Sequence, residues 1–198
     1  MSGVVVVDYR AGNLTSVVKA LEFLGAEIEV TSDPDVVDRA SRVVLPGVGH
    51  FSATRFLWER GLTDAIRSSV LRGVPFLGIC VGLQWLFDGS TEAHDVPGAG
   101  LLRGRCERFQ TKEKVPHVGW NSLSPAPRSR LMEGVAEGAY VYFTHSYRVS
   151  PQKSTVAVTE YGGPFTAAAE SDNVMGVQFH PEKSGPTGLA ILKNFLEL

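Results

Sequence analysis

Apolar residues in the first half of the chain alternate between short continuous runs and helical spacings. Residues 4–7 are an unbroken run of valine, which is typical of a strand buried on both faces of a parallel sheet. The next apolar positions recur with the spacing of an amphipathic helix that ends before Gly25: Leu14, Val17, Val18, Leu21 and Leu24. A strand followed by a helix therefore opens the chain.

The alternation continues through the following segments. Residues 26–31, 42–45 and 76–79 each have the composition of a strand. Asp33 and Pro34 predict the cap and first turn of a short helix after the first of them. A longer helix before the last strand is marked by three apolar positions: Leu62, Ile66 and Val70. This order predicts a three-layer α/β fold with a mostly parallel sheet and right-handed crossovers.

The second half of the chain predicts short strands joined by turns. Four segments have strand character: residues 141–143, 155–159, 165–169 and 174–179. Gly162 with Gly163, and Asp172 with Asn173, predict turns between neighbouring strands, so we expect antiparallel hairpins added to the sheet. Residues 188–198 predict a closing helix. Because no linker or repeat divides the sequence, we predict a single domain over residues 1–198.

Composition narrows the classes of function. The 198 residues can bury a sizeable core, and a net charge of −2 gives no footprint for nucleic acid. Glu107 and Glu113 dilute the richest basic stretch, which predicts a solvated strand or hairpin face: Arg103, Arg105, Arg108, Lys112 and Lys114. The first apolar run is too short for a signal or a membrane span, and two cysteines make no disulfide framework. We expect a cytoplasmic protein that binds neither nucleic acid nor membrane.

The strongest chemical signal is a cysteine between two glycines. Gly78, Cys80 and Gly82 lie where a predicted strand passes into a helix over residues 81–87, which is the form of a nucleophile elbow. Side chains at the glycine positions would collide in such a turn. A helix N-terminus favours a thiolate, although a lone cysteine in an apolar run can also be a small buried hydrophobe.

A cysteine nucleophile needs a base and a group that orients the base. Of five histidines, only His180 directly follows a predicted strand and has a carboxylate, Glu182, two residues later. Residues two apart in an extended chain point to the same side, and Pro181 disfavours helix at His180. Cys80, His180 and Glu182 therefore predict a catalytic triad at the carboxyl ends of neighbouring strands. The same histidine and glutamate could also be an ordinary surface pair.

A glycine-containing loop follows the third predicted strand. Gly47, Val48 and Gly49 lack the lysine and hydroxyl residues of a phosphate loop. We expect N–H groups of this loop, with that of Val81, to face a developing oxyanion. His145 could join the triad's histidine and carboxylate in a zinc site, but no paired histidine or cysteine spacing supports one. We therefore expect no metal and no cofactor.

These motifs resemble those of the class I, triad-type glutamine amidotransferases. The resemblance lies in residues 78–84 and 179–182, in the same order along the chain. Within that class the chain is similar to the glutaminase subunits of imidazole glycerol phosphate synthases, on four further segments: residues 8–14, 45–49, 115–121 and 143–147. The resemblance implies hydrolysis of L-glutamine to L-glutamate and ammonia through a thioester on Cys80. Arg10 and Val81 are small departures from the pattern.

The same resemblance implies roles for further residues. Those implied to hold the amino-acid end of L-glutamine are Gln84, Glu92, His145, Ser146 and Tyr147. The implied partner is the (β/α)8-barrel cyclase subunit of the synthase, in a heterodimer that acts in histidine biosynthesis. The residues implied to lie near that interface are Asn13, Trp120, Tyr140 and Lys183. Glu92 and His145 could instead be exposed loop residues, and Trp120 could belong to the core.

The resemblance also implies that glutamine hydrolysis is weak until the cyclase binds its ligand, which requires two states of residues 46–49. Three alternatives stay open. Another free-standing class I glutaminase, such as that of pyridoxal phosphate synthesis, would not be expected to carry the segment 117–121. A non-catalytic subunit would keep only the fold. A cysteine-dependent peptidase or chaperone of similar architecture would act without a partner.

Overall fold

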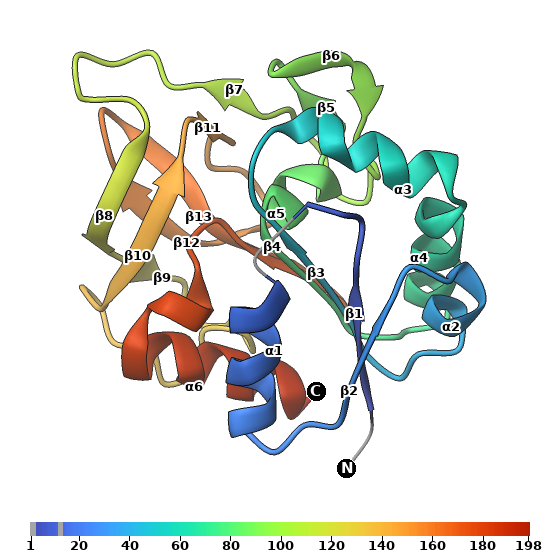
Figure 1. Ribbon diagram of the computed structural model, residues 1–198. Helices are drawn as coiled ribbons and strands as arrows, with labels where there is room; N and C mark the ends of the chain where they lie inside the picture. Colours follow the sequence, from blue (N-terminus) through green and yellow to red (C-terminus); the bar gives the residue numbers. More distant parts are fainter. Residues whose placement is uncertain (1–2, 12–13) are drawn as a thin grey trace.

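The computed structural model describes residues 3–11 and 14–198, arranged around an eight-stranded sheet of order β2-β1-β3-β4-β14-β13-β12-β9 (Figure 1). Its strands are β1 Val4–Val7, β2 Ile28–Thr31, β3 Val43–Gly47, β4 Phe76–Cys80, β9 Ser124–Pro125, β12 Thr155–Glu160, β13 Pro164–Ser171 and β14 Val174–Val177. Strands β2, β1, β3, β4 and β14 are neighbours in the sheet and run parallel to one another. Strands β13, β12 and β9 continue the sheet with antiparallel pairings. The predicted mostly parallel sheet with antiparallel additions is confirmed.

Helices on both faces of the sheet make three layers. The helices are α1 Leu14–Phe23, α2 Pro34–Asp38, α3 Arg55–Glu59, α4 Leu62–Leu71, α5 Val81–Leu86 and α6 Gly185–Leu196, with 3-10 turns η1 Phe51–Thr54 and η2 Pro181–Lys183. Helices α1 and α6 cover one face, and α2 and α4 cover the other (Figure 1). Asp33 caps α2 as predicted, accepting a hydrogen bond from the Asp35 N–H at 2.9 Å.

Three small two-stranded sheets lie beside the main sheet. Their strands are β5 Gly89–Ser90 with β6 Ala93–Pro97, β7 Glu107–Arg108 with β11 Tyr147–Arg148, and β8 His117–Ser122 with β10 Tyr140–His145. The expectation that residues 141–143 extend the main sheet is therefore wrong. Alternate residues of β10 are buried, so one face of the β8–β10 hairpin covers the core and the other is partly exposed.

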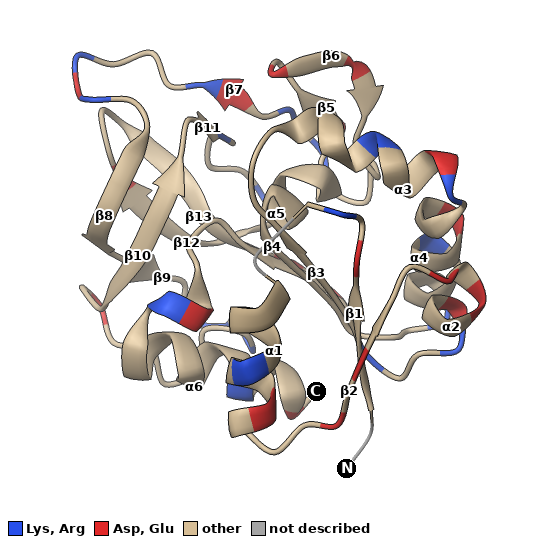
Figure 2. Ribbon diagram, in the orientation of Figure 1, with Lys and Arg blue, Asp and Glu red and all other residues tan. Residues whose placement is uncertain are grey.

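The carboxyl ends of three central strands meet at one edge of the sheet. Gly47 of β3 lies opposite Cys80 of β4, and Val177 of β14 lies opposite Ile79. Strands β3 and β4 are wholly buried and carry no charged residue, whereas charged residues mark the outer helices and loops (Figure 2). This edge is where open α/β sheets place their sites.

The predicted basic stretch contributes the short strand β7, whose two residues, Glu107 and Arg108, are both exposed, as expected for a solvated strand. Within residues 3–11 and 14–198, no helix has the length and apolar character needed to cross a membrane.

Candidate active site

The backbone at Cys80 has the strained geometry of an elbow. Cys80 ends β4 and directly precedes α5, with φ of 55° and ψ of −105°, a conformation rare for any residue other than glycine. Burial of the strand before it and of the helix after it holds the chain in this turn. The thiol is thereby lifted from the end of the sheet to the start of a helix.

The two flanking glycines allow the chain to pass close to itself. A Cβ at Gly78 would collide with the backbone of Gly82, and one at Gly82 would collide with the carbonyl of Leu45 on β3. A Cβ at Gly47 would likewise meet the Tyr9 hydroxyl and, at 2.9 Å, the Val81 Cβ. The steric reason for the glycines of the predicted elbow is therefore confirmed.

His180 and Glu182 form a buried pair. The His180 Nδ1 lies 2.9 Å from the Glu182 Oε1, and the two side chains are only 2% and 1% exposed. The predicted route to this pairing was wrong, because Pro181–Lys183 is a 3-10 turn rather than extended chain. Only His180 itself is extended, with φ of −99° and ψ of 96°, and the turn then brings the carboxylate back to the imidazole.

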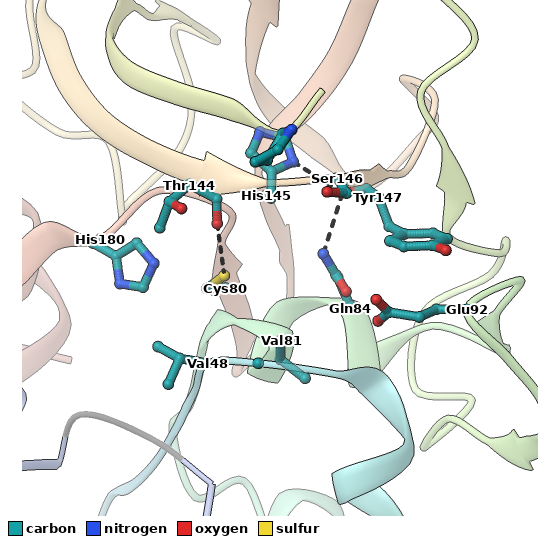
Figure 3. Close-up of a pocket in the computed structure, with 12 residues that line it drawn as sticks. Val48, Cys80, Val81, Gln84, Glu92, Thr144, His145, Ser146, Tyr147 and His180 are labelled. Atoms are coloured by element: carbon teal, nitrogen blue, oxygen red, sulfur yellow. Dashed lines mark hydrogen bonds between the residues drawn. The ribbon is translucent and has the colours of Figure 1, made fainter. Parts of the chain in front are cut away.

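The sulfur of Cys80 lies among three polar groups. Figure 3 shows His180 beside it and Thr144 above it. The Sγ lies 4.0 Å from the Thr144 carbonyl oxygen and 3.6 Å from the Gln178 Nε2. The His180 Nε2 has no hydrogen-bond partner in the described part of the chain, which leaves it available for the reaction.

Burial and neighbouring charge act in opposite directions on His180. Burial alone would lower its pKa, but the interactions with Cys80 and Glu182 outweigh burial and raise the pKa to about 9. At neutral pH His180 therefore holds a proton that it can give to a leaving group. Cys80, His180 and Glu182 are thus brought together in the arrangement that a cysteine nucleophile requires.

A cavity of about 270 Å³ opens in front of the sulfur. It is lined by Val48, Gly49, Cys80, Val81, Gln84, Glu92, Pro116, Thr144, His145, Ser146, Tyr147 and His180. All five residues expected to hold glutamine are in this set and are labelled in Figure 3. Three of the four residues expected at the oxyanion are in it too: Val48, Gly49 and Val81. Gly47 is absent from the lining because it belongs to β3 and packs behind Val81.

The side chains of two residues expected to bind glutamine, Gln84 and Glu92, are hydrogen-bonded to other parts of the protein. The Gln84 Nε2 donates to the Tyr147 carbonyl at 3.2 Å and to the Gln178 Oε1 at 3.1 Å, so both of its amide hydrogens have acceptors. The Glu92 Oε2 accepts from the Phe51 N–H at 2.8 Å, at the start of η1, which follows the glycine loop. What these two side chains still offer a ligand is carboxamide and carboxylate oxygen.

A chain of hydrogen bonds supports His145 from behind. Its Nδ1 donates to the Tyr147 carbonyl at 2.9 Å, so its Nε2 accepts from the His117 Nδ1 at 3.0 Å. The His117 Nε2 in turn accepts from the Asn121 amide at 3.3 Å. Burial lowers the pKa of His145 to about 3 and that of His117 to about 4, so both rings are neutral.

Sequence reasoning assigned no role to His117, Asn121, Thr144 or Gln178. The two residues on β8 reach the site only because β8 pairs with β10, which places His117 directly opposite His145. No local pattern in the sequence predicts that pairing. Gln178 lay in the predicted strand 174–179, but β14 ends at Val177 and a bend follows at residues 178–179, so the alternation of a strand does not place its side chain.

Of the residues expected at a partner interface, Trp120 and Tyr140 lie on β8 and β10, and Lys183 lies beside them on η2. Trp120 is 54% exposed and Tyr140 is 59% exposed, so the core alternative for Trp120 is wrong. The exposed Lys183 has its Nζ 6.0 Å from the centre of the Tyr142 ring, and Tyr142 lies opposite Trp120. Asn13 lies outside the described residues.

Comparison with known proteins agrees with this geometry. The family model described as "Glutamine amidotransferase class-I" matches residues 5–198. The chain is 46% identical over 196 residues to the imidazole glycerol phosphate synthase subunit HisH of Methanothermobacter thermautotrophicus, covering 98% of each chain. It is 47% identical over 201 residues to the HisH of Moorella thermoacetica, covering 100% of this chain and 96% of that one.

Among solved structures, a glutamine amidotransferase is similar with a TM-score of 0.78 and 22% identity, covering 98% of both chains. The PurLQS structure from Thermotoga maritima is similar with a TM-score of 0.76 and 23% identity, covering 100% of this chain and 99% of that one. The similarity to these two solved structures establishes the fold. The two HisH relatives, at 46% and 47% identity, identify the subfamily. The chain belongs to the class I glutamine amidotransferases and, within them, to the HisH subunits of imidazole glycerol phosphate synthase.

Proposed function

We propose that this protein is a glutaminase that hydrolyses L-glutamine to L-glutamate and ammonia and supplies the ammonia to a separate cyclase subunit. The single observation that supports the reaction most strongly is a thiol at a strained elbow beside a buried imidazole and carboxylate pair, facing a small polar cavity. The other free-standing class I glutaminases are not favoured, since the relatives compared are HisH subunits along their whole length.

In the first step the Cys80 thiolate attacks the side-chain carboxamide carbon of glutamine. The carbonyl oxygen becomes an oxyanion, for which we propose the Val81 N–H and N–H groups of residues 47–49 as donors. Loss of one such donor typically costs about 3 kcal/mol in the transition state. His180 gives its proton to the departing nitrogen, so the C–N bond breaks and neutral ammonia leaves a γ-glutamyl thioester on the sulfur.

In the second step His180, now neutral, takes a proton from water as the water oxygen attacks the thioester carbonyl. The C–S bond breaks, and glutamate and the thiolate–imidazolium pair are restored. Glu182 holds the Nδ1 proton of His180 throughout and stabilises the imidazolium, a role supported by the 2.9 Å contact between them. No metal or cofactor is required by these steps.

The amino-acid end of glutamine has to be held across the cavity from the sulfur. We propose that its ammonium and carboxylate groups are bound by side chains and backbone at Gln84, Glu92, His145, Ser146 and Tyr147. This assignment is supported by the position of all five on the cavity lining. The Glu92 carboxylate is the natural partner for the ammonium, because one of its oxygens is not engaged by the Phe51 N–H.

We propose the (β/α)8-barrel cyclase subunit of imidazole glycerol phosphate synthase as the partner, in a heterodimer. The residues proposed at the interface are Asn13, Trp120, Tyr140 and Lys183; the exposed aromatic face of the β8–β10 hairpin supports three of them. Ammonia entering the cyclase would complete imidazole glycerol phosphate and an aminoimidazole carboxamide ribonucleotide, a step of histidine biosynthesis. A cytoplasmic location and a single domain over residues 1–198 stay predictions.

Ammonia release by the chain alone, with the cyclase, and with the cyclase and its nucleotide ligand tests the proposal. We expect weak release by the chain alone and strong release only in the full mixture, because residues 46–49 would have to change state. Cys80→Ala should abolish glutamine-dependent turnover but leave turnover with added ammonia. Full glutaminase activity of the isolated chain would contradict the coupling, and activity in Cys80→Ala would contradict the triad.

A further inference from the structure

We propose that Gln178 is a further catalytic residue, whose side-chain N–H holds the Cys80 sulfur in its thiolate form. Gln178 follows β14 and has no exposed surface, and its Nε2 lies 3.6 Å from the sulfur. Burying an amide is unfavourable unless its polar atoms have hydrogen-bond partners, and the Cys80 sulfur is such a partner for the Gln178 NH2. The inference rests on the proposed use of Cys80 as nucleophile.

The surrounding hydrogen bonds decide which end of the amide faces the sulfur. The Tyr147 carbonyl can only accept, so the group that Gln84 directs at it must be its NH2. The same Gln84 NH2 donates to the Gln178 Oε1 at 3.1 Å. With its oxygen occupied in this way, Gln178 must present its NH2 to Cys80.

The main chain holds Gln178 in this position as well. Its backbone N–H donates to the Ala167 carbonyl of β13 at 2.8 Å. His180 lies two residues further on, beyond a bend at residues 178–179, and both side chains interact with the sulfur. Gln84 belongs to α5, the helix that begins after Cys80, and packs one turn beyond it.

Two groups that contact the Cys80 sulfur favour different protonation states, one the thiol and the other the thiolate. The Thr144 carbonyl, 4.0 Å away, can contact a thiol S–H favourably, but its oxygen repels a thiolate. The Gln178 N–H acts in the opposite sense, because a charged sulfur is the better acceptor. His180 and the buried Tyr9 are two titratable groups that interact with Cys80, and the Gln178 amide adds an N–H donor that does not itself titrate.

The rate at which iodoacetamide alkylates Cys80 in the isolated chain, followed against pH by mass spectrometry of the Cys80 peptide, tests this role. We expect Gln178→Met to move the midpoint of the rising limb up by about one pH unit, with alkylation about tenfold slower below it. Gln178→Glu keeps the oxygen that accepts from Gln84 but places a carboxylate beside the sulfur, so its upward shift should be larger.

Gln110→Met is the matched control, because Gln110 is exposed and should leave the profile unchanged. An unshifted limb in a folded Gln178→Met variant would overturn the proposal. If that variant does not fold, an unshifted limb in Gln178→Glu overturns it equally. The assay needs neither glutamine nor cyclase. Failure of the wild-type protein to release ammonia in the full mixture with the cyclase and its ligand would therefore refute the proposed function and still leave the role of Gln178 measurable.

Discussion

Two neighbouring histidines of the pocket have pKa values shifted in opposite directions. The pKa of His145 is lowered to about 3 because burial of the ring outweighs the raising effect of its hydrogen bond to the Tyr147 carbonyl. His180 is buried too, but beside a sulfur and a carboxylate, and its pKa is raised to about 9. The pocket therefore contains one protonated imidazole, that of His180, and one neutral imidazole, that of His145.

Thioester formation should slow as pH rises through about 9, because His180 then loses the proton that the leaving nitrogen needs. Single-turnover ammonia release in the complete assembly between pH 6 and pH 10 measures this falling limb. The limb reports the Cys80–His180 pair as a unit. A rate that keeps rising to pH 10 would contradict the assignment of His180 as the acid.

The same shift affects stability. The folded-state pKa of His180 lies above the ordinary value of 6.5, so its stabilising contribution is complete below that pH and is lost as pH rises through about 9. We expect the free energy of unfolding in urea to fall across this window. In His180→Asn this part of the pH dependence should disappear, and its persistence would locate the proton elsewhere.

Glu182→Gln keeps the shape of the side chain but removes the charge that stabilises the imidazolium. We expect the rate of glutamine hydrolysis to fall by between about a hundredfold and ten-thousandfold, as when an orienting carboxylate of a triad is neutralised. The falling limb near pH 9 should also move to lower pH. Glu197→Gln, at an exposed carboxylate 3.6 Å from Lys193, is the control and should have neither effect.

At the scale of elements, the close approach of α5 to β3 leaves no room for a side chain at Gly82. A Cβ there would collide with the Leu45 carbonyl, which belongs to the backbone of β3 and cannot turn away. We expect Gly82→Ala to lower the free energy of unfolding by about 3 kcal/mol. Gly3→Ala, whose Cβ would lie 3.8 Å from the Glu27 carbonyl oxygen, should change it by less than about 0.5 kcal/mol.

Elements marked by an apolar run, a helical spacing or a capping residue could be predicted from the sequence. Elements whose place depends on pairing with a distant strand could not. The buried runs of β1 and β4, the spacing in α1 and the cap of α2 are local signals. The place of β10 beside the core depends on its pairing with β8, and β9 and a series of turns separate the two strands in the sequence. Neither η1 nor α3 was predicted, because too few of their residues are buried to give a helical spacing: Phe51 and Thr54 in η1 and Leu57 in α3.

The candidate site divides in the same way. Cys80, His180 and Glu182 could be found because their motifs are short and local, although the turn that joins the last two was not foreseen. Gln84 was expected to bind substrate, but the use of its NH2 by Tyr147 and Gln178 follows only from the packed structure. Long-range hydrogen bonds leave no periodic trace in a sequence.

At the scale of the whole molecule, the exposed aromatic face of β8 and β10 is separate from the core that stabilises the fold. Trp120→Ala should therefore change the free energy of unfolding by less than about 1 kcal/mol and weaken binding of the cyclase by about 2 kcal/mol or more. Titration calorimetry with the cyclase measures the second effect.

Phe23→Ala is the matched control for that interface. Phe23 is 78% exposed at the far end of α1, so its removal should leave cyclase binding unchanged. Equal loss of binding in both variants would indicate that exposed aromatic area in general, rather than the hairpin face, controls association.

The chain of hydrogen bonds from Asn121 through His117 to His145 has a chemical consequence for the proposed product. Every nitrogen of the two rings is engaged, and neither ring takes up a proton near neutral pH. His180, once it has protonated the leaving nitrogen, stays neutral until it takes a proton from water in the second step. A freshly released ammonia molecule thus meets no acid among these histidines, and it keeps the lone pair that makes it a nucleophile for the next enzyme.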